Sequence, residues 1–260
     1  MSDLILETLG LTKNFLGFTA VQGVDLKVRR GSVHALIGPN GAGKSTCFNL
    51  LTKFLEPSSG RIAYNGQDIT RTAPAVLARR GMVRSFQISA TFGAMTVLQN
   101  VRVALQRRAV DSFCFWRSSR TLQALHPRAM ELLEQVGLAG HAHQLAADLP
   151  YGRRRALELA TTLALEPELM LLDEPTQGMG HVDVDTVTTL IQRVAQGRTV
   201  LLVEHNLQVV SRIADTITVL QRGQILAEGS YDRVSHDPRV VEAYMGSSAA
   251  ALGGEGGHGG

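Results

Sequence analysis

The segment VHALIGPNGAGKST, residues 33–46, decides the fold class of this chain of 260 residues. Its first part, residues 33–37, is apolar enough to form a buried strand. Its last part, GPNGAGKST, matches the pattern G-x-x-x-x-G-K-[ST] in full. The match lies between a predicted strand and a predicted helix, which is the setting that this pattern requires. The segment therefore predicts a loop that holds the phosphates of a nucleotide.

The residue types of this loop suit an anion. Gly38, Gly41 and Gly43 let the backbone turn tightly, so that several N–H groups can point at one phosphate. The helix that follows presents its positive end to the same anion. Lys44 adds a positive charge near the outer phosphates, and Ser45 is placed to ligate Mg²⁺. We expect the nucleotide to contact the whole loop: Gly38, Pro39, Asn40, Gly41, Ala42, Gly43, Lys44, Ser45 and Thr46.

A second stretch, LMLLDE at residues 169–174, predicts a buried strand that ends in two carboxylates. In open α/β sheets, ligands bind beyond the carboxyl ends of the strands, so these carboxylates belong at the binding edge. We expect Asp173 to hold Mg²⁺ through water. Glu174 is its neighbour and is expected to polarise the water that attacks the phosphate.

The rest of the pattern favours an α/β fold. Apolar strands at residues 169–173 and 199–205 alternate with helical segments, which is typical of a mainly parallel sheet covered on both faces. Asn65-Gly66 and Arg222-Gly223 each lie between strand-like segments and predict hairpin turns. We therefore expect a small antiparallel sheet near the start. Helical periodicity from about residue 95 to 165 predicts a helical lobe, with one apolar face formed by Ala156, Leu159, Ala160 and Leu163.

The composition is that of an ordinary soluble domain, with 44% hydrophobic and 19% charged residues. The sequence contains no apolar run long enough to span a bilayer. A net charge of +3 is too small to indicate a nucleic-acid partner. The two cysteines, Cys47 and Cys114, cannot build a disulfide framework, and a reduced, cytosolic protein fits best. The glycine-rich residues 247–260 are expected to be disordered.

Together, these motifs resemble the ATP-binding-cassette ATPases over the stretch from Leu4 to Gly246. The resemblance implies a RecA-like P-loop NTPase core, with an antiparallel β subdomain at the N-terminus and an inserted helical subdomain at about residues 92–165. It implies a stacking role on adenine for Phe15, with Phe18 as the competing candidate. Gln87 is implied to contact the metal and the attacking water. His205 is implied to contact the terminal phosphate and the catalytic glutamate.

The signature segment of that family is usually LSGGQ, and here residues 149–155 read LPYGRRR. In the family this segment opens a helix and binds the terminal phosphate that is held by the other subunit. Pro150 and Arg153 replace the usual serine and glutamine. We therefore expect the N–H groups of Tyr151 and Gly152 to make the phosphate contact. Gly180 also stands where many members carry aspartate.

Four phrases resemble the larger of two paralogous ATPase types in branched-chain amino-acid importers: GMVRSFQ, LPYG, LLVEHNLQVV and EAYMG. The resemblance implies an ATP- and Mg²⁺-dependent subunit at the cytoplasmic face of the inner membrane. Its partners would be two permeases, a second ATPase subunit and, indirectly, an extracytoplasmic solute-binding protein. The alternatives are an exporter subunit and a cassette ATPase outside transport. The transported solute is left open, because the ATPase does not touch it.

The segment at residues 111–127 combines aromatic residues with arginines, and it includes Phe113, Phe115 and Trp116. One interpretation is a small cap that packs on the helical lobe. The other is a patch that contacts a permease, because exposed aromatic residues and arginine are enriched in interfaces.

Overall fold

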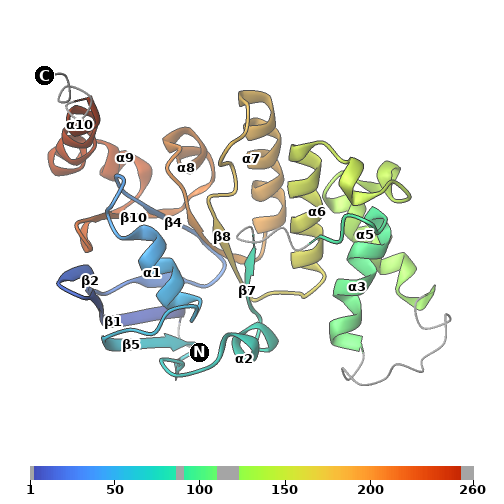
Figure 1. The fold of residues 1–260 in the computed structure, drawn as a ribbon, viewed down its shortest axis with the longest axis horizontal. Helices are drawn as coiled ribbons and strands as arrows, with labels where there is room; N and C mark the ends of the chain where they lie inside the picture. Colours follow the sequence, from blue (N-terminus) through green and yellow to red (C-terminus); the bar gives the residue numbers. More distant parts are fainter. Residues whose placement is uncertain (1–2, 86–90, 110–122, 253–260) are drawn as a thin grey trace, which may run out of the picture. The chain divides into compact units, whose positions relative to one another are not determined.

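The computed structural model describes residues 3–85, 91–109 and 123–252. The chain forms two compact units, and Figure 1 draws the helices and strands of both. The first unit comprises residues 1–74 and 201–260, and the second comprises residues 75–200.

The first unit contains the N-terminal strands, the helix after the phosphate loop, and the C-terminal strands and helices. Its strands are β1 (Leu4–Phe15), β2 (Phe18–Val24), β3 (Lys27–Arg29), β4 (Val33–Ile37), β5 (Ser59–Tyr64), β6 (Gln67–Asp68), most of β9 (Thr199–Val203), β10 (Thr216–Gln221) and β11 (Gln224–Gly229). Its helices are α1 (Lys44–Leu51), α8 (Leu207–Ile213), α9 (Tyr231–Ser235) and α10 (Pro238–Leu252).

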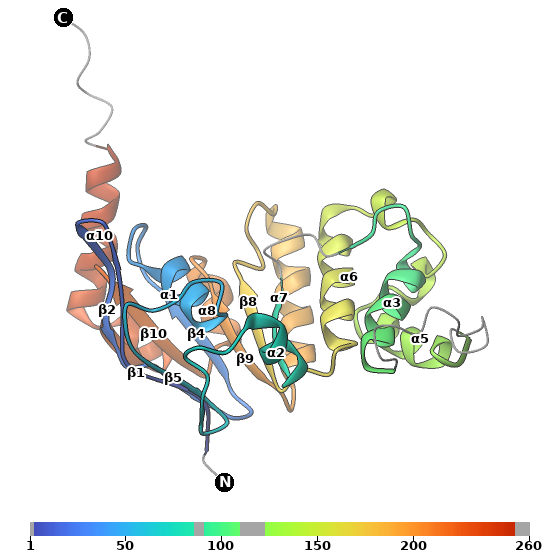
Figure 2. The same ribbon diagram turned by 60° about the horizontal axis from the view of Figure 1, so that its bottom comes forward.

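The predicted antiparallel sheet near the start is confirmed. β1 pairs in antiparallel fashion with β2, β3 and β5, and Figure 2 shows β1, β2 and β5 side by side. The turn from β5 to β6 is formed by Asn65 and Gly66, with φ of 51° and 74°. Two successive residues in the left-handed region match the twist of a hairpin, and this is why the Asn-Gly pair was informative.

The second sheet of this unit carries the phosphate loop. Its strands lie in the order β11-β10-β4-β9, and β4 pairs in parallel with β10. All five residues of β4 are buried, in agreement with its continuous apolar pattern. The predicted turn between β10 and β11 is confirmed, with φ of 49° at Arg222 and 80° at Gly223.

His34 places an ionisable ring inside this sheet. Its Nε2 lies 2.8 Å from Thr218 Oγ1, and the Thr218 hydroxyl donates to Glu228 Oε2 at 2.7 Å. A hydroxyl has one proton to donate, so the His34 ring must donate to Thr218. Burial lowers the pKa of His34 from 6.5 to about 4, because the charged imidazolium loses its hydration.

We predict a stability loss in mild acid that depends on His34. The unfolded chain, with a His pKa near 6.5, binds this proton before the folded protein does. The contribution of the neutral, buried His34 ring to the free energy of unfolding is therefore complete above about pH 6.5 and is lost as the pH falls toward 4. Between pH 7 and 5 the free energy of unfolding should fall by about 2 kcal/mol more than in His34→Asn, as measured by urea unfolding. If the free energy of unfolding changed equally between pH 7 and 5 in the unmodified protein and in His34→Asn, the prediction would be contradicted.

The described residues of the second unit form a pair of strands and a group of helices. The strands β7 (Met82–Ser85) and β8 (Leu169–Asp173) pair in parallel. The helices are α2 (Pro74–Arg79), α3 (Val97–Ala109), α5 (His126–Gln135), α6 (Tyr151–Leu163) and α7 (His181–Ala195), with 3-10 turns η1 (Ala139–His141) and η2 (Ala146–Asp148). The helices α3, α5 and α6 lie together in Figures 1 and 2 and form the predicted helical region.

The predicted apolar face of α6 is buried. Ala156, Leu159, Ala160 and Leu163 are each at most 7% exposed. The fold class is therefore confirmed: a mostly parallel sheet, an antiparallel N-terminal sheet and a helical region. Among the described residues, no helix is both long enough and apolar enough to cross a bilayer.

The C-terminus departs from the prediction. We expected a disordered tail from Ser247, but α10 continues to Leu252. The reason lies in Ala249, Ala250 and Ala251, because alanine has the highest helix propensity and extends a helix that has already begun. Residues 253–260 lie outside the described part of the chain.

Candidate functional site

The phosphate loop runs from the end of β4 into α1, as predicted. The structure assigns Gly38, Gly41 and Gly43 φ values of 151°, 77° and 98°, where side chains are strained. At Gly38, a Cβ would collide with the backbone oxygen of Leu220, and at Gly43 with that of Ala20. These glycines are therefore required by the loop's conformation and by backbone packing.

Lys44 closes the loop on itself. Its ammonium group donates to the carbonyl oxygens of Gly38 at 2.7 Å and Pro39 at 3.0 Å, and the residue is only 7% exposed. The two carbonyls hold the ammonium group inside the bend of the loop. A phosphate that enters the bend meets this charge together with backbone N–H groups.

Neighbouring strands fix the loop from outside. The Gly223 N–H, in the turn between β10 and β11, donates to the Ala42 carbonyl at 2.9 Å. The Gly223 carbonyl in turn accepts from the Gln22 N–H at 2.8 Å, so β2 supports the same turn. The loop is therefore tied to two sheets rather than only to its own strand and helix.

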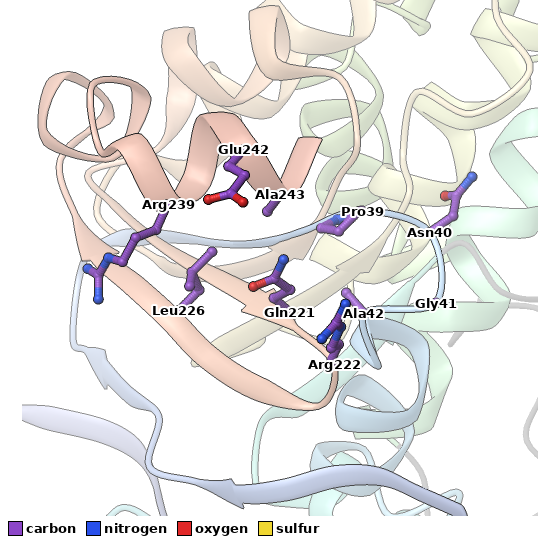
Figure 3. Close-up of a pocket in the computed structure, with 10 residues that line it drawn as sticks. All are labelled: Pro39, Asn40, Gly41, Ala42, Gln221, Arg222, Leu226, Arg239, Glu242 and Ala243. Carbon is purple, nitrogen blue, oxygen red and sulfur yellow. The ribbon is translucent and has the colours of Figure 1, made fainter. Parts of the chain in front are cut away.

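The C-terminal helix supports the other side of the loop. A cavity of about 570 Å³ lies between the loop and α10 (Figure 3). Its lining consists of Pro39, Asn40, Gly41, Ala42, Gln221, Arg222, Leu226, Arg239, Glu242 and Ala243. Burial raises the pKa of the Tyr244 hydroxyl to about 12, and the nearby backbone of Gly38 acts on that pKa in the opposite direction. Tyr244 lies within the phrase EAYMG, but the sequence pattern alone does not indicate that this ring lies near the phosphate loop.

The two aromatic candidates for adenine stacking lie at the end of the β1–β2 hairpin. Phe15 and Phe18 are directly opposite each other, and they are 45% and 63% exposed. The Lys13 ammonium lies 5.3 Å from the centroid of the Phe15 ring. Phe18 stands two residues before Ala20, whose carbonyl faces Gly43. Both rings are therefore accessible near the exit of the phosphate loop.

His205 emerges beside the start of the phosphate loop. The Glu204 N–H donates to the Leu36 carbonyl at 3.4 Å, so the ends of β9 and β4 lie side by side. The buried Glu204 carboxylate accepts from the N–H groups of His205 at 3.0 Å and Asn206 at 3.2 Å. The His205 side chain is 53% exposed, so its ring can reach a ligand. The structure thus brings His205 and the phosphate loop to one edge of the first unit.

In the second unit, Asp173 ends β8 as predicted, and it has an unexpected partner. Arg84 on β7 donates from Nη2 to Asp173 Oδ2 at 2.6 Å, with the two side chains only 8% and 17% exposed. This ion pair could not be predicted from the sequence, because nothing in a strand residue such as Arg84 indicates which side chain on the neighbouring strand it will face. The pair fixes one carboxylate oxygen of Asp173.

Glu174 begins a tight turn. Its φ is 45°, in the left-handed region that residues with side chains rarely adopt. The Gln177 N–H donates to the Glu174 carbonyl at 3.1 Å and closes the turn. Such conformations cluster at functional sites, where the surrounding structure over-determines them.

The signature segment opens α6. Pro150 is the residue that caps the helix, and the Arg154 N–H donates to its carbonyl at 2.9 Å. The proline lies one position before the first helical residue, where its fixed φ leads into the helix. A Cβ on Gly152 would lie 2.8 Å from the Asp183 carboxylate of α7. Close packing within the unit therefore also favours glycine at this position.

We predict that Gly152→Asp abolishes ATP hydrolysis and that Pro150→Ser does not. An aspartate at position 152 would face Asp183 and would repel a phosphate at the start of α6. Loss of one charge-assisted contact of about 1.5–3 kcal/mol by itself slows turnover about ten- to a hundredfold, and the repulsion between the new carboxylate and the phosphate adds to that loss. Serine restores a hydroxyl and leaves the helix start intact, so activity should be retained or raised.

ATPase rates measured with permeases and the partner ATPase present provide the test. Gly152→Ala is the control, because Asp183 is exposed and its carboxylate can move away from a methyl group. If both Gly152→Asp and Pro150→Ser behave like the unmodified protein, this segment makes no phosphate contact.

Some predicted residues lie outside the described part of the chain. Gln87 falls within residues 86–90, and Phe113, Phe115 and Trp116 fall within residues 110–122. Their predicted roles therefore stay predictions.

Each of the two units carries an oxygen donor of the kind that Mg²⁺ binds. Ser45, in the first turn of α1, offers an exposed hydroxyl, and Asp173 retains a second carboxylate oxygen beside the one paired with Arg84. Within the described residues, no three histidine, cysteine, aspartate or glutamate side chains gather into a metal site. Mg²⁺ binds with few protein ligands when phosphates and water complete its shell, so a single oxygen donor on each unit is of a suitable kind.

Comparison with known proteins agrees with this geometry. Residues 21–177 match the family described as ABC transporter, and residues 224–250 match the family described as Branched-chain amino acid ATP-binding cassette transporter. The chain is 38% identical to the high-affinity branched-chain amino acid transport ATP-binding protein BraF of Pseudomonas aeruginosa, over 95% of this chain and 100% of that protein. It is 36% identical to LivG of Escherichia coli K12, again over 95% of this chain and 100% of that protein.

A solved structure gives the same result. The ADP conformation of MJ1267, an ATP-binding cassette of an ABC transporter, is 31% identical to this chain. The TM-score is 0.81, and the alignment covers 94% of this chain and all of that one. The chain therefore belongs to the ATP-binding-cassette ATPases of ABC transporters, within the family of branched-chain amino acid transport ATP-binding proteins.

Proposed function

We propose that this chain binds ATP at residues 38–46 and hydrolyses it to drive solute uptake through separate permeases. The observation that carries the proposal is the phosphate loop, with Lys44 held inside its bend by the carbonyls of Gly38 and Pro39. Phe15 stacks on adenine in this proposal, and Phe18 is the alternative.

In the hydrolytic step, the oxygen of a water molecule bonds to the terminal phosphorus. The bond between that phosphorus and the bridging oxygen breaks, and ADP leaves with the bridging oxygen. Glu174 accepts the proton of the attacking water. His205 contacts the terminal phosphate and keeps Glu174 oriented, and Gln87 contacts the water. Lys44 and the loop N–H groups stabilise the charge that builds on the phosphate oxygens.

Mg²⁺ is the proposed cofactor. Ser45 and Asp173 would hold it, with Gln87 as a third contact. When bound, it neutralises phosphate charge. The ion pair with Arg84 restrains Asp173 in the orientation that its strand gives it.

The signature segment acts on a second nucleotide site. The N–H groups of Tyr151 and Gly152 contact the terminal phosphate of ATP held by a partner ATPase. The site is shared, so a lone subunit hydrolyses ATP poorly. As the resemblance to importer ATPases implies, the chain would lie at the cytoplasmic face of the membrane, beneath two permeases.

The solute class is branched-chain amino acids or related small polar solutes. The support is that BraF and LivG are branched-chain amino acid transport ATP-binding proteins, together with the C-terminal family match at residues 224–250. Uptake of labelled leucine by cells that lack this chain tests the proposal. Normal uptake, with impaired transport of another solute, would redirect the proposal to that solute.

We predict that the assembled transporter contains this chain and a different ATPase, one copy of each. The resemblance to the larger of two paralogous ATPases supports this expectation. Native mass measurement of the complex, purified through a tag on this chain, provides the test. Two copies of this chain without a second ATPase would contradict it.

A further inference from the structure

Two side chains at the start of α6 connect the signature segment to the turn at Glu174. Arg155 donates from Nη2 to the Tyr151 hydroxyl oxygen at 2.8 Å, and that hydroxyl lies 3.3 Å from the Gln177 carbonyl oxygen. The Arg155 guanidinium also lies 5.2 Å from the centroid of the Tyr151 ring. All these residues belong to the second unit.

The directions of these hydrogen bonds are fixed by chemistry. Arginine has only donors, so the Tyr151 oxygen must accept from Arg155. The single phenolic proton is then available for the Gln177 carbonyl, which can only accept. The Tyr151 hydroxyl therefore accepts from Arg155 and donates to Gln177, so that one oxygen atom joins the two residues.

Gln177 continues the connection to Glu174. Its carbonyl accepts from Tyr151, and its N–H donates to the Glu174 carbonyl at 3.1 Å. This second bond closes the turn in which Glu174 has a φ of 45°. A residue with a side chain keeps this conformation only where its surroundings hold it there.

The other end of the connection is buried. Arg155 donates from Nη1 to Glu158 Oε2 at 2.8 Å, and the two side chains are 13% and 4% exposed. A buried, hydrogen-bonded ion pair has little freedom to rearrange, so Arg155 is a fixed point on α6. Tyr151, which is 45% exposed, extends from this fixed point to the turn.

We propose that Tyr151 is a positioning residue for Glu174, with Arg155 as its anchor. The usual LSGGQ segment has glycine at this position, so it cannot make the connection. The hydroxyl holds the Gln177 peptide, which holds the turn that aims Glu174 at its water. The start of α6 and the turn at Glu174 are thereby coupled within one subunit. The inference rests on the proposed role of Glu174 as the base.

The test is Tyr151→Phe in the transporter purified through a tag on this chain. Phenylalanine keeps the ring, its contact with Arg155 and the backbone N–H, and it removes only the hydroxyl. We expect kcat for ATP to fall about three- to tenfold, as for loss of one hydrogen bond. KM for ATP and the thermal unfolding midpoint should not change. Tyr231→Phe, the same chemical change on α9, is the matched control and should leave kcat unchanged.

A second variant tests the anchor. Arg155→Lys keeps the charge beside Glu158 but offers a single ammonium in place of the planar fork. It should lower kcat to a similar extent, and the double variant Tyr151→Phe/Arg155→Lys should be no slower than the slower single variant. If kcat of the double variant fell by the product of the two single-variant factors, the two side chains would act independently, which would overturn the connection.

Three further outcomes are decisive. Normal kcat in Tyr151→Phe, with Glu174→Gln inactive, would overturn the positioning role and leave the proposed function intact. A higher KM with normal kcat would make Tyr151 a nucleotide contact instead. Normal hydrolysis by Glu174→Gln would overturn the proposed base and the inference with it.

Discussion

Lys44→Ala is expected to abolish ATPase activity and to weaken nucleotide binding at least about a hundredfold, because two or more charge-assisted contacts of about 1.5–3 kcal/mol each are lost. Lys44 carries the ammonium group that lies inside the bend of the phosphate loop, against the carbonyls of Gly38 and Pro39. Its removal leaves those two carbonyls facing the phosphates without a positive charge between them. The two carbonyl oxygens then repel the phosphates, in addition to the loss of attraction by the Lys44 ammonium group.

Binding of a fluorescent ATP analogue and phosphate release by the assembled transporter measure the two effects. Lys27→Ala is the control, because it removes the same charge from an exposed position on β3. The thermal unfolding midpoint of Lys44→Ala separates loss of binding from loosening of the loop. Affinity and turnover equal to those of the unmodified protein would show that residues 38–46 do not bind the nucleotide.

Glu174→Gln is expected to slow hydrolysis about a hundred- to ten-thousandfold, the range of a missing general base, and to leave ATP bound. The amide has nearly the shape of the carboxylate, so the turn with φ of 45° should persist. Bound ATP should then hold two ATPase subunits together, because a ligand that binds only the joined state stabilises it.

Light scattering of the Glu174→Gln ATPase subunits, with and without ATP and Mg²⁺, detects the joined pair of subunits as a larger species. Glu134→Gln, an exposed position on α5, is the matched control and should hydrolyse ATP normally. A Glu174→Gln variant that turns over at the normal rate would exclude Glu174 as the base, and another group would have to accept the proton.

Much of the fold could be predicted from local patterns. The strand, loop and helix at residues 33–51, the Asn65-Gly66 and Arg222-Gly223 turns, and the buried face of α6 follow from hydrophobic period and from the special conformations of glycine and asparagine. These rules act between residues that are near in sequence. Alanine at positions 249–251 follows the same rules, and the prediction of disorder there gave too much weight to the glycines beyond it.

The sequence by itself therefore determined the fold class, the phosphate loop, and the strand that ends in Asp173 and Glu174. The family also followed from the sequence, through the order of its motifs. Only the tertiary structure decided which groups meet across long separations: the side chains of Arg84 and Asp173, and the Tyr151 hydroxyl with the Gln177 carbonyl. The physical reason is that hydrogen-bond rules and hydrophobic periods describe neighbours along the chain, whereas these pairs exist only after packing has brought separate elements together.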